Sequence, residues 1–218
     1  MYYPLKLALF FVFSFAIVIL FSLLFENSLN LSIEKLSNKN DFSEMNIIPI
    51  CCAWGSEIKD GILTYSIKDG NKTLDNAVIE ATSLWNSHLN GLQFEKSKGN
   101  TDIKISFTAD GKAVAGKTTN LVDNQGFIRK SNIILAKESF DKAYSILQLE
   151  KNAEHELGHV LGLEHANFNG NLMSTNTASI TSNISPCVIE AVDTANAWKL
   201  KEDDSESIHG PTQNHVVC

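Results

Sequence analysis

The chain is organised around one stretch, His155-Glu156-Leu157-Gly158-His159-Val160-Leu161-Gly162-Leu163-Glu164-His165. In a helix, His155 and His159 lie one turn apart on the same face, close enough to share one metal ion. Glu156 can then reach a metal-bound water without binding the metal itself. Gly162 can end the helix in a left-handed conformation, so the chain can turn back and bring in His165 as a third imidazole. Three neutral nitrogens and one open position are typical of a catalytic zinc site rather than a structural one. The alternative is an amphipathic core helix that carries histidines by chance.

These residues match the signature His-Glu-x-x-His-x-x-Gly-x-x-His, and the sequence thereby resembles the metzincin metalloproteases. The second hallmark of that family is a Met-turn, for which Met173 in Asn171-Leu172-Met173-Ser174-Thr175 is the candidate. Its separation from His165 is similar to that in the matrixins, the branch that contains the matrix metalloproteases. No Tyr follows Tyr144, which disfavours the branches that use a Tyr after the Met as an extra zinc ligand.

The resemblance implies a zinc-dependent endopeptidase that acts on protein or peptide substrates. Zinc held by His155, His159 and His165 would lower the pKa of its bound water toward about 7, and Glu156 would act as the general base. Ala166 departs from the matrixin pattern, which usually has Ser at that position, so the subfamily stays open. The alternative from another class is a membrane-anchored, zinc-containing binding or adhesion module without turnover.

Hydrophobic periodicity predicts an α+β domain. The resemblance specifies a metzincin or zincin-like fold, with a mixed, mostly parallel twisted sheet, two long helices and a C-terminal helix. Apolar residues at helical spacing predict a helix over 74–88 and a second one from Ser145, where Gln148 completes a capping box. Ser185-Pro186 is typical of a helix start. The expected strands are 62–67, 92–94, 102–107 and a last strand that includes 126–128 and 132–135.

The N-terminal region predicts a membrane anchor. Residues 7–25 are apolar and uncharged and would span roughly 28 Å as a helix, close to the thickness of a bilayer core. Residues 1–6 would then be cytoplasmic and the rest extracytoplasmic. A cleaved signal peptide, which would give a secreted protein, is the competing interpretation. Residues 26–53 are interpreted as a stalk or short pro-segment, 54–200 as the catalytic domain and 201–218 as a polar tail.

Export would permit disulfides among Cys51, Cys52, Cys187 and Cys218. Adjacent cysteines rarely bond each other, so we expect Cys51 or Cys52 to pair with Cys187 or Cys218, with the connectivity open. A further hypothesis is that Cys51 or Cys52 occupies the open zinc position and keeps an enzyme latent.

The remaining features limit the partners. A net charge of −7 and the lack of a Lys/Arg cluster argue against nucleic acid. The Gly-rich region after Asp110 resembles the matrixin segment that carries a second, structural zinc and the edge strand that binds substrate. No His lies between His88 and His155, so the second zinc is not expected. Asp110, Asp123 and Asn124 are candidate calcium ligands.

Overall fold

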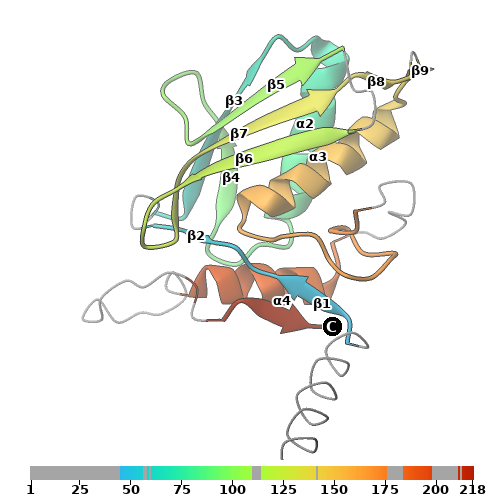
Figure 1. The fold of residues 1–218 in the computed structure, drawn as a ribbon. Helices are drawn as coiled ribbons and strands as arrows, with labels where there is room; N and C mark the ends of the chain where they lie inside the picture. The colour runs from blue at the N-terminus through green and yellow to red at the C-terminus, as the bar shows by residue number, and fades with distance from the viewer. Residues whose placement is uncertain are drawn as a thin grey trace, which may run out of the picture. The chain divides into compact units, whose positions relative to one another are not determined.

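A mostly parallel sheet forms the centre of the fold in the computed structural model, which describes residues 45–55, 58, 60–109, 114–140, 142–175, 184–197, 211 and 213–218 (Figure 1). Strands β4 (Gln93–Lys96), β3 (Ile62–Lys68), β5 (Ile103–Thr108) and β7 (Phe127–Ala136) follow one another in parallel. The short β2 (Ala53–Trp54) is also parallel to β7, whereas β6 (Gly116–Val122) runs antiparallel to it. The prediction of a mixed, mostly parallel sheet is confirmed.

Three helices complete the described part of the domain, and each begins at a side-chain cap. Asn71 accepts a hydrogen bond from the amide of Leu74 at the start of α2 (Lys72–Asn86). Helix α3 (Ile146–Val160) begins with the predicted capping box of Ser145 and Gln148. Ser185 caps α4 (Pro186–Ala195), which has Pro in its first turn as the sequence indicates.

One apolar core joins the sheet to α2 and α3, which pack side by side against it (Figure 1). Two fully buried tryptophans also hold α3 by their indole N–H groups. Trp85 of α2 donates to the carbonyl of Glu154, and Trp54 of β2 donates to that of Val160. A buried indole needs such a partner, so these bonds fix α3 against two different elements.

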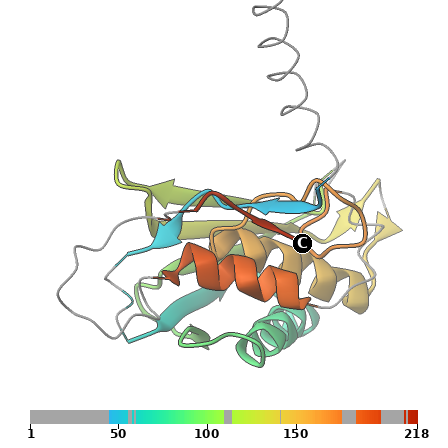
Figure 2. The same ribbon diagram turned by 90° about the horizontal axis from the view of Figure 1, so that it is seen from below.

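The compact unit begins at Asn46, earlier than the predicted boundary at residue 54. Strand β1 (Ile47–Pro49) pairs antiparallel with β10 (His215–Val217), and Figure 2 shows the two running side by side. Residues 47–49 and 215–217, which the sequence pattern places in a stalk or short pro-segment and in a polar tail, form these two strands. Two three-residue strands far apart in sequence carry too few residues for a period-2 pattern to show.

The structure contradicts the expected pairing of the cysteines. Cys187 in α4 bonds Cys218 just after β10, and Cys51 bonds its neighbour Cys52. Pairing of β10 with β1 places Cys218 beside α4, with 5.7 Å between the Cα atoms of Cys187 and Cys218. With Cys187 and Cys218 bonded to each other, Cys51 and Cys52 form the second disulfide.

The short strands β8 (Glu138–Ser139) and β9 (Lys142–Ala143) pair antiparallel just before α3.

The predicted membrane segment 7–25 and the cytoplasmic end 1–6 lie outside the described residues. None of the helices in the described part of the chain has the length and hydrophobicity needed to cross a bilayer.

Candidate active site

The three predicted imidazoles converge at the end of α3. His155, His159 and His165 each offer a ring nitrogen, and these three atoms lie within 4.8 Å of one another. The ring centroids are 4.8 to 5.2 Å apart. Among the described residues this is the one group of three or more His, Cys, Asp or Glu side chains placed to hold a metal ion.

Main-chain carbonyls fix the tautomer of the two helical histidines. Nδ1 of His155 lies 2.6 Å from the carbonyl oxygen of Leu172, and Nδ1 of His159 lies 2.7 Å from that of Leu163. A carbonyl only accepts, so each Nδ1 carries the proton and each Nε2 keeps a lone pair for a metal. Burial lowers the pKa of His159 to about 4 and also lowers that of His155, so both rings stay neutral near pH 7. This donor set fits a divalent zinc ion.

The turn that carries His165 is packed against the segment around β1. Gly162 has a φ of +97°, and a Cβ there would collide with the carbonyl oxygen of Cys52. The Cys51 amide donates to the Gly162 carbonyl at 2.9 Å, and the Glu164 amide donates to that of Pro49 at 2.8 Å. Glycine at position 162 therefore serves both the turn and the close approach of the neighbouring chain.

Met173 is fully buried between α3 and the turn that carries His165. A Cβ on Gly158 would collide with its Sδ, so a side chain at 158 would force Met173 to move. The Met173 carbonyl also accepts the Ala166 amide at 2.8 Å, next to His165. The predicted Met-turn residue thus packs directly against the ligand-bearing helix and its following loop.

Glu156, the predicted general base, is 5% exposed and contacts the edge strand β6. The Thr118 hydroxyl lies 2.6 Å from Oε2 of Glu156 and 3.1 Å from its main-chain oxygen. Burial raises the pKa of Glu156 to about 7, although hydrogen bonding to Thr118 offsets part of that increase. A buried carboxyl group with a raised pKa beside a metal-binding cluster is typical of a functional site.

Sequence comparison agrees with this geometry, because residues 54–209 match the matrixin family. The chain is a matrixin. No curated protein matches it. Matrixins are zinc metallopeptidases, and the three-histidine group supplies the site that such an ion needs.

The matrixin cleft lies between β6 and the end of α3 and has a volume of about 410 Å³. Glu156, His159 and His165 face it from the helix side, while Gly116, Lys117 and Thr118 line it from the strand side. The sequence identified the helix side of the cleft. It did not identify Thr118, because a threonine in a strand is ordinary for β-structure and carries no functional signal.

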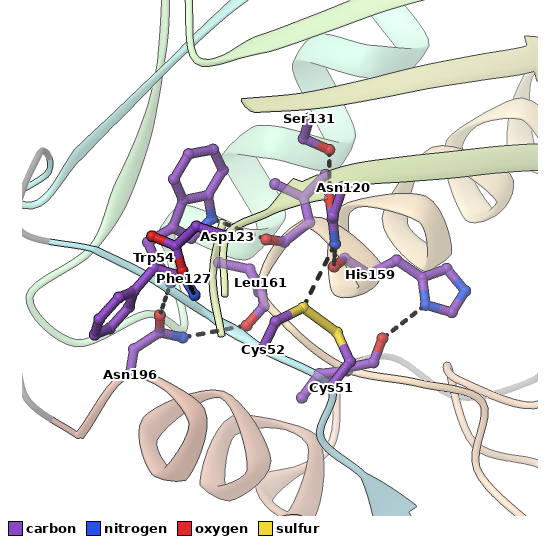
Figure 3. Close-up of a disulfide and its surroundings, with 12 residues drawn as sticks. Cys51, Cys52, Trp54, Asn120, Asp123, Phe127, Ser131, His159, Leu161 and Asn196 are labelled. Carbon is purple, nitrogen blue, oxygen red and sulfur yellow. Dashed lines mark hydrogen bonds between the residues drawn. A yellow bond between two sulfur atoms is a disulfide. The ribbon is translucent and has the colours of Figure 1, made fainter. Parts of the chain in front are cut away.

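Cys51 lines the same cleft, but both sulfurs of the Cys51–Cys52 pair are bonded to each other (Figure 3). All four cysteines lie in the described part of the chain, and none of them is free. A disulfide sulfur is not the thiolate that binds a metal, so the latency hypothesis is not supported in this oxidised form.

The calcium hypothesis for this matrixin gains no support at Asp123. Its Oδ1 accepts the amides of Gln125 and Phe127, and its Oδ2 accepts the Arg129 guanidinium. Both carboxylate oxygens of Asp123 are therefore engaged in hydrogen bonds within the turn between β6 and β7 and the start of β7. Asp110 lies outside the described residues.

Proposed function

We propose that this matrixin is an endopeptidase that hydrolyses peptide bonds of proteins, with Glu156 as the general base. The observation that carries the proposal is the position of Glu156, which lines the same cleft as His159 and His165. A zinc ion bound there supplies a Lewis acid that polarises a carbonyl and makes a bound water more acidic.

The chain's own groups account for the proton transfers. The Thr118 hydroxyl donates to Oε2 of Glu156, and the carboxylate would take the proton of the attacking water. With a pKa of about 7, the carboxyl group can accept that proton and then give it to the departing amine near neutral pH. His155 and His159 stay neutral ligands because burial disfavours the imidazolium by more than the hydrogen bonds to their carbonyl partners favour it.

The substrate would lie as an extended peptide along residues 116–118 of β6. One edge of β6 pairs with β7, and no strand of the described chain pairs with the other. An exposed strand edge offers a row of backbone donors and acceptors that an extended peptide can use. This arrangement supports a protein or peptide as substrate rather than a small molecule.

The deciding experiment is the Glu156→Gln variant, assayed on an unstructured protein and on a peptide library. Gln keeps the shape of the side chain but cannot accept the proton, so we expect kcat/KM to fall about 10²- to 10⁴-fold. Bound zinc, measured by metal analysis, should be unchanged. The matched control is Glu80→Gln at an exposed position of α2, which should cleave as the wild type does.

The competing proposal is a zinc-containing binding or adhesion module without turnover. It would be favoured if the wild type and Glu156→Gln both held one zinc and neither cleaved any substrate. The intact set of three histidines and one buried glutamate favours the enzyme, because a binding module has no use for a carboxyl group that is costly to bury.

We also propose that the catalytic domain lies outside the cytoplasm. Both disulfides support this location, because such bonds persist in oxidising compartments and are rare in the cytosol. Protease added to intact cells should digest the domain, whereas protection until the cells are lysed would contradict the location.

A further inference from the structure

We infer that Thr118 is a positioning residue for Glu156, which ties the orientation of the base to the strand that would bind the substrate. The inference rests on the proposed function and adds to it a residue that the sequence pattern does not indicate. The hydroxyl oxygen of Thr118 lies 2.6 Å from Oε2 of Glu156, where Glu156 is buried and Thr118 is half-buried. Hydrogen bonds to a carboxylate are shorter and stronger than neutral ones, so this contact restrains the carboxylate effectively.

A second observation on the same strand supports this role. Gly116 lies two residues before Thr118, so both face the same side of β6. A Cβ on Gly116 would lie 2.7 Å from Cγ and 2.8 Å from Cδ of Glu156. The space that a side chain at 116 would need is therefore filled by Glu156. Strand β6 therefore leaves room for the Glu156 side chain at Gly116 and binds its carboxylate through Thr118.

Asn120, the next inward-facing residue of β6, fixes the strand itself to the helix. Its Nδ2 donates to the carbonyl of His159 at 2.8 Å, and its Oδ1 accepts from the hydroxyl of Ser131 in β7 at 2.8 Å. The strand is thus attached to α3 at Glu156 and at His159. These bonds hold the base, one metal ligand and the edge of the strand in place relative to one another, as a near-attack arrangement requires.

The test uses the full-length protein loaded with zinc and compares four variants. Thr118→Val removes the hydroxyl, Thr118→Ser keeps it, and Gly116→Ala fills the space that Glu156 occupies. Thr119→Val is the matched control, because Thr119 is the exposed neighbour on β6 and does not line the cleft. Crystal structures report the orientation of the Glu156 carboxylate, and steady-state kinetics report kcat and KM separately.

In the crystal structures, we expect the Glu156 carboxylate to have a single conformation in the wild type, Thr118→Ser and Thr119→Val. In Thr118→Val and Gly116→Ala we expect it to be displaced or to have more than one conformation. This readout does not depend on turnover, so it tests the positioning role even if the proposed peptidase activity is wrong. An unchanged carboxylate in Thr118→Val overturns the inference.

In the kinetics, Thr118→Val and Gly116→Ala should lower kcat by between about tenfold and a hundredfold with KM nearly unchanged. Thr118→Ser should restore kcat to within about threefold of the wild type, because the donor is kept. A role in stability alone would lower the melting temperature and leave kcat intact, and that result would also overturn the inference. The two proposals can fail separately. If the wild type cleaves nothing, the proposed function is refuted, but a displaced carboxylate in Thr118→Val would still support the positioning role.

Discussion

Two carboxyl groups of this matrixin, one buried and one half-buried, show how the surroundings of a side chain decide its charge state. Burial raises the pKa of Glu156, and Thr118 only partly compensates. Burial also acts to raise the pKa of Asp102, but the Thr64 hydroxyl and amide and the Lys130 ammonium outweigh it, so that pKa is lowered. Asp102 is therefore a structural anion, because its donors lie in β3 and β7 beside the start of β5.

The lowered pKa of Asp102 predicts a pH-dependent contribution to stability. A group whose pKa is lower in the folded than in the unfolded protein stabilises the fold at pH values above its unfolded pKa. Asp102→Asn should therefore lower the free energy of unfolding by about 2 kcal/mol at pH 7. The difference from the wild type should shrink as pH falls below the usual value of 3.8 for this carboxyl group.

Urea unfolding of both proteins between pH 7 and pH 3 measures this difference. Asp75→Asn is the control, since the ion pair of Asp75 with Lys96 is exposed and such pairs contribute less than about 1 kcal/mol. A gap between wild type and Asp102→Asn that stayed constant over the whole pH range would contradict the assignment.

Helix α3 shows which parts of an element a sequence can reveal. Its start was predictable, because a capping box lies within four consecutive residues and apolar residues follow at helical spacing. Its end depends on three side chains from other elements (Figure 3). The carbonyls of three successive residues, His159, Val160 and Leu161, accept hydrogen bonds from Asn120, Trp54 and Asn196. These partners lie 35 to 106 residues away, so no local pattern indicates them.

Of these three, Asn196 should matter most to the stability of the helix end. It is 2% exposed, donates to the carbonyls of Leu161 and Val192, and accepts the Trp54 amide through Oδ1. Asn196→Ala leaves buried backbone groups without partners, which should cost about 3 kcal/mol of unfolding free energy. Thermal and urea unfolding would measure the loss. Asn124→Ala, at an exposed turn position, is the comparison and should cost less than about 1 kcal/mol. Equal stability of the two variants would show that Asn196 is not needed at the end of α3.

At the scale of the whole molecule, the ends of the described domain support the metal site. The motif from His155 to His165 and Met173 were visible in the sequence because each lies within one short segment. The support behind them was not visible, since it comes from β1 and from the residues just after it. The Asn167 amide donates to the carbonyl of Ile47, and the side-chain oxygen of Asn167 accepts the Ile47 amide at 2.8 Å. Pairing with β10 and the Cys187–Cys218 disulfide then hold β1 in place.

This arrangement predicts that removing β1 weakens metal binding, although no metal ligand is lost. A chain that begins at Asn46 keeps the backbone partners of the turn around His165, whereas one that begins at Trp54 lacks those supplied by Ile47, Pro49 and Cys51. Loss of groups that orient a ligand typically costs about 10- to 100-fold in metal affinity. We therefore expect the shorter chain to bind zinc more weakly by that factor in competition with a chelating dye, with circular dichroism to establish that its helices are retained. If both chains bound zinc equally, the turn that carries His165 would have to be held by α3 and the Met173 segment alone.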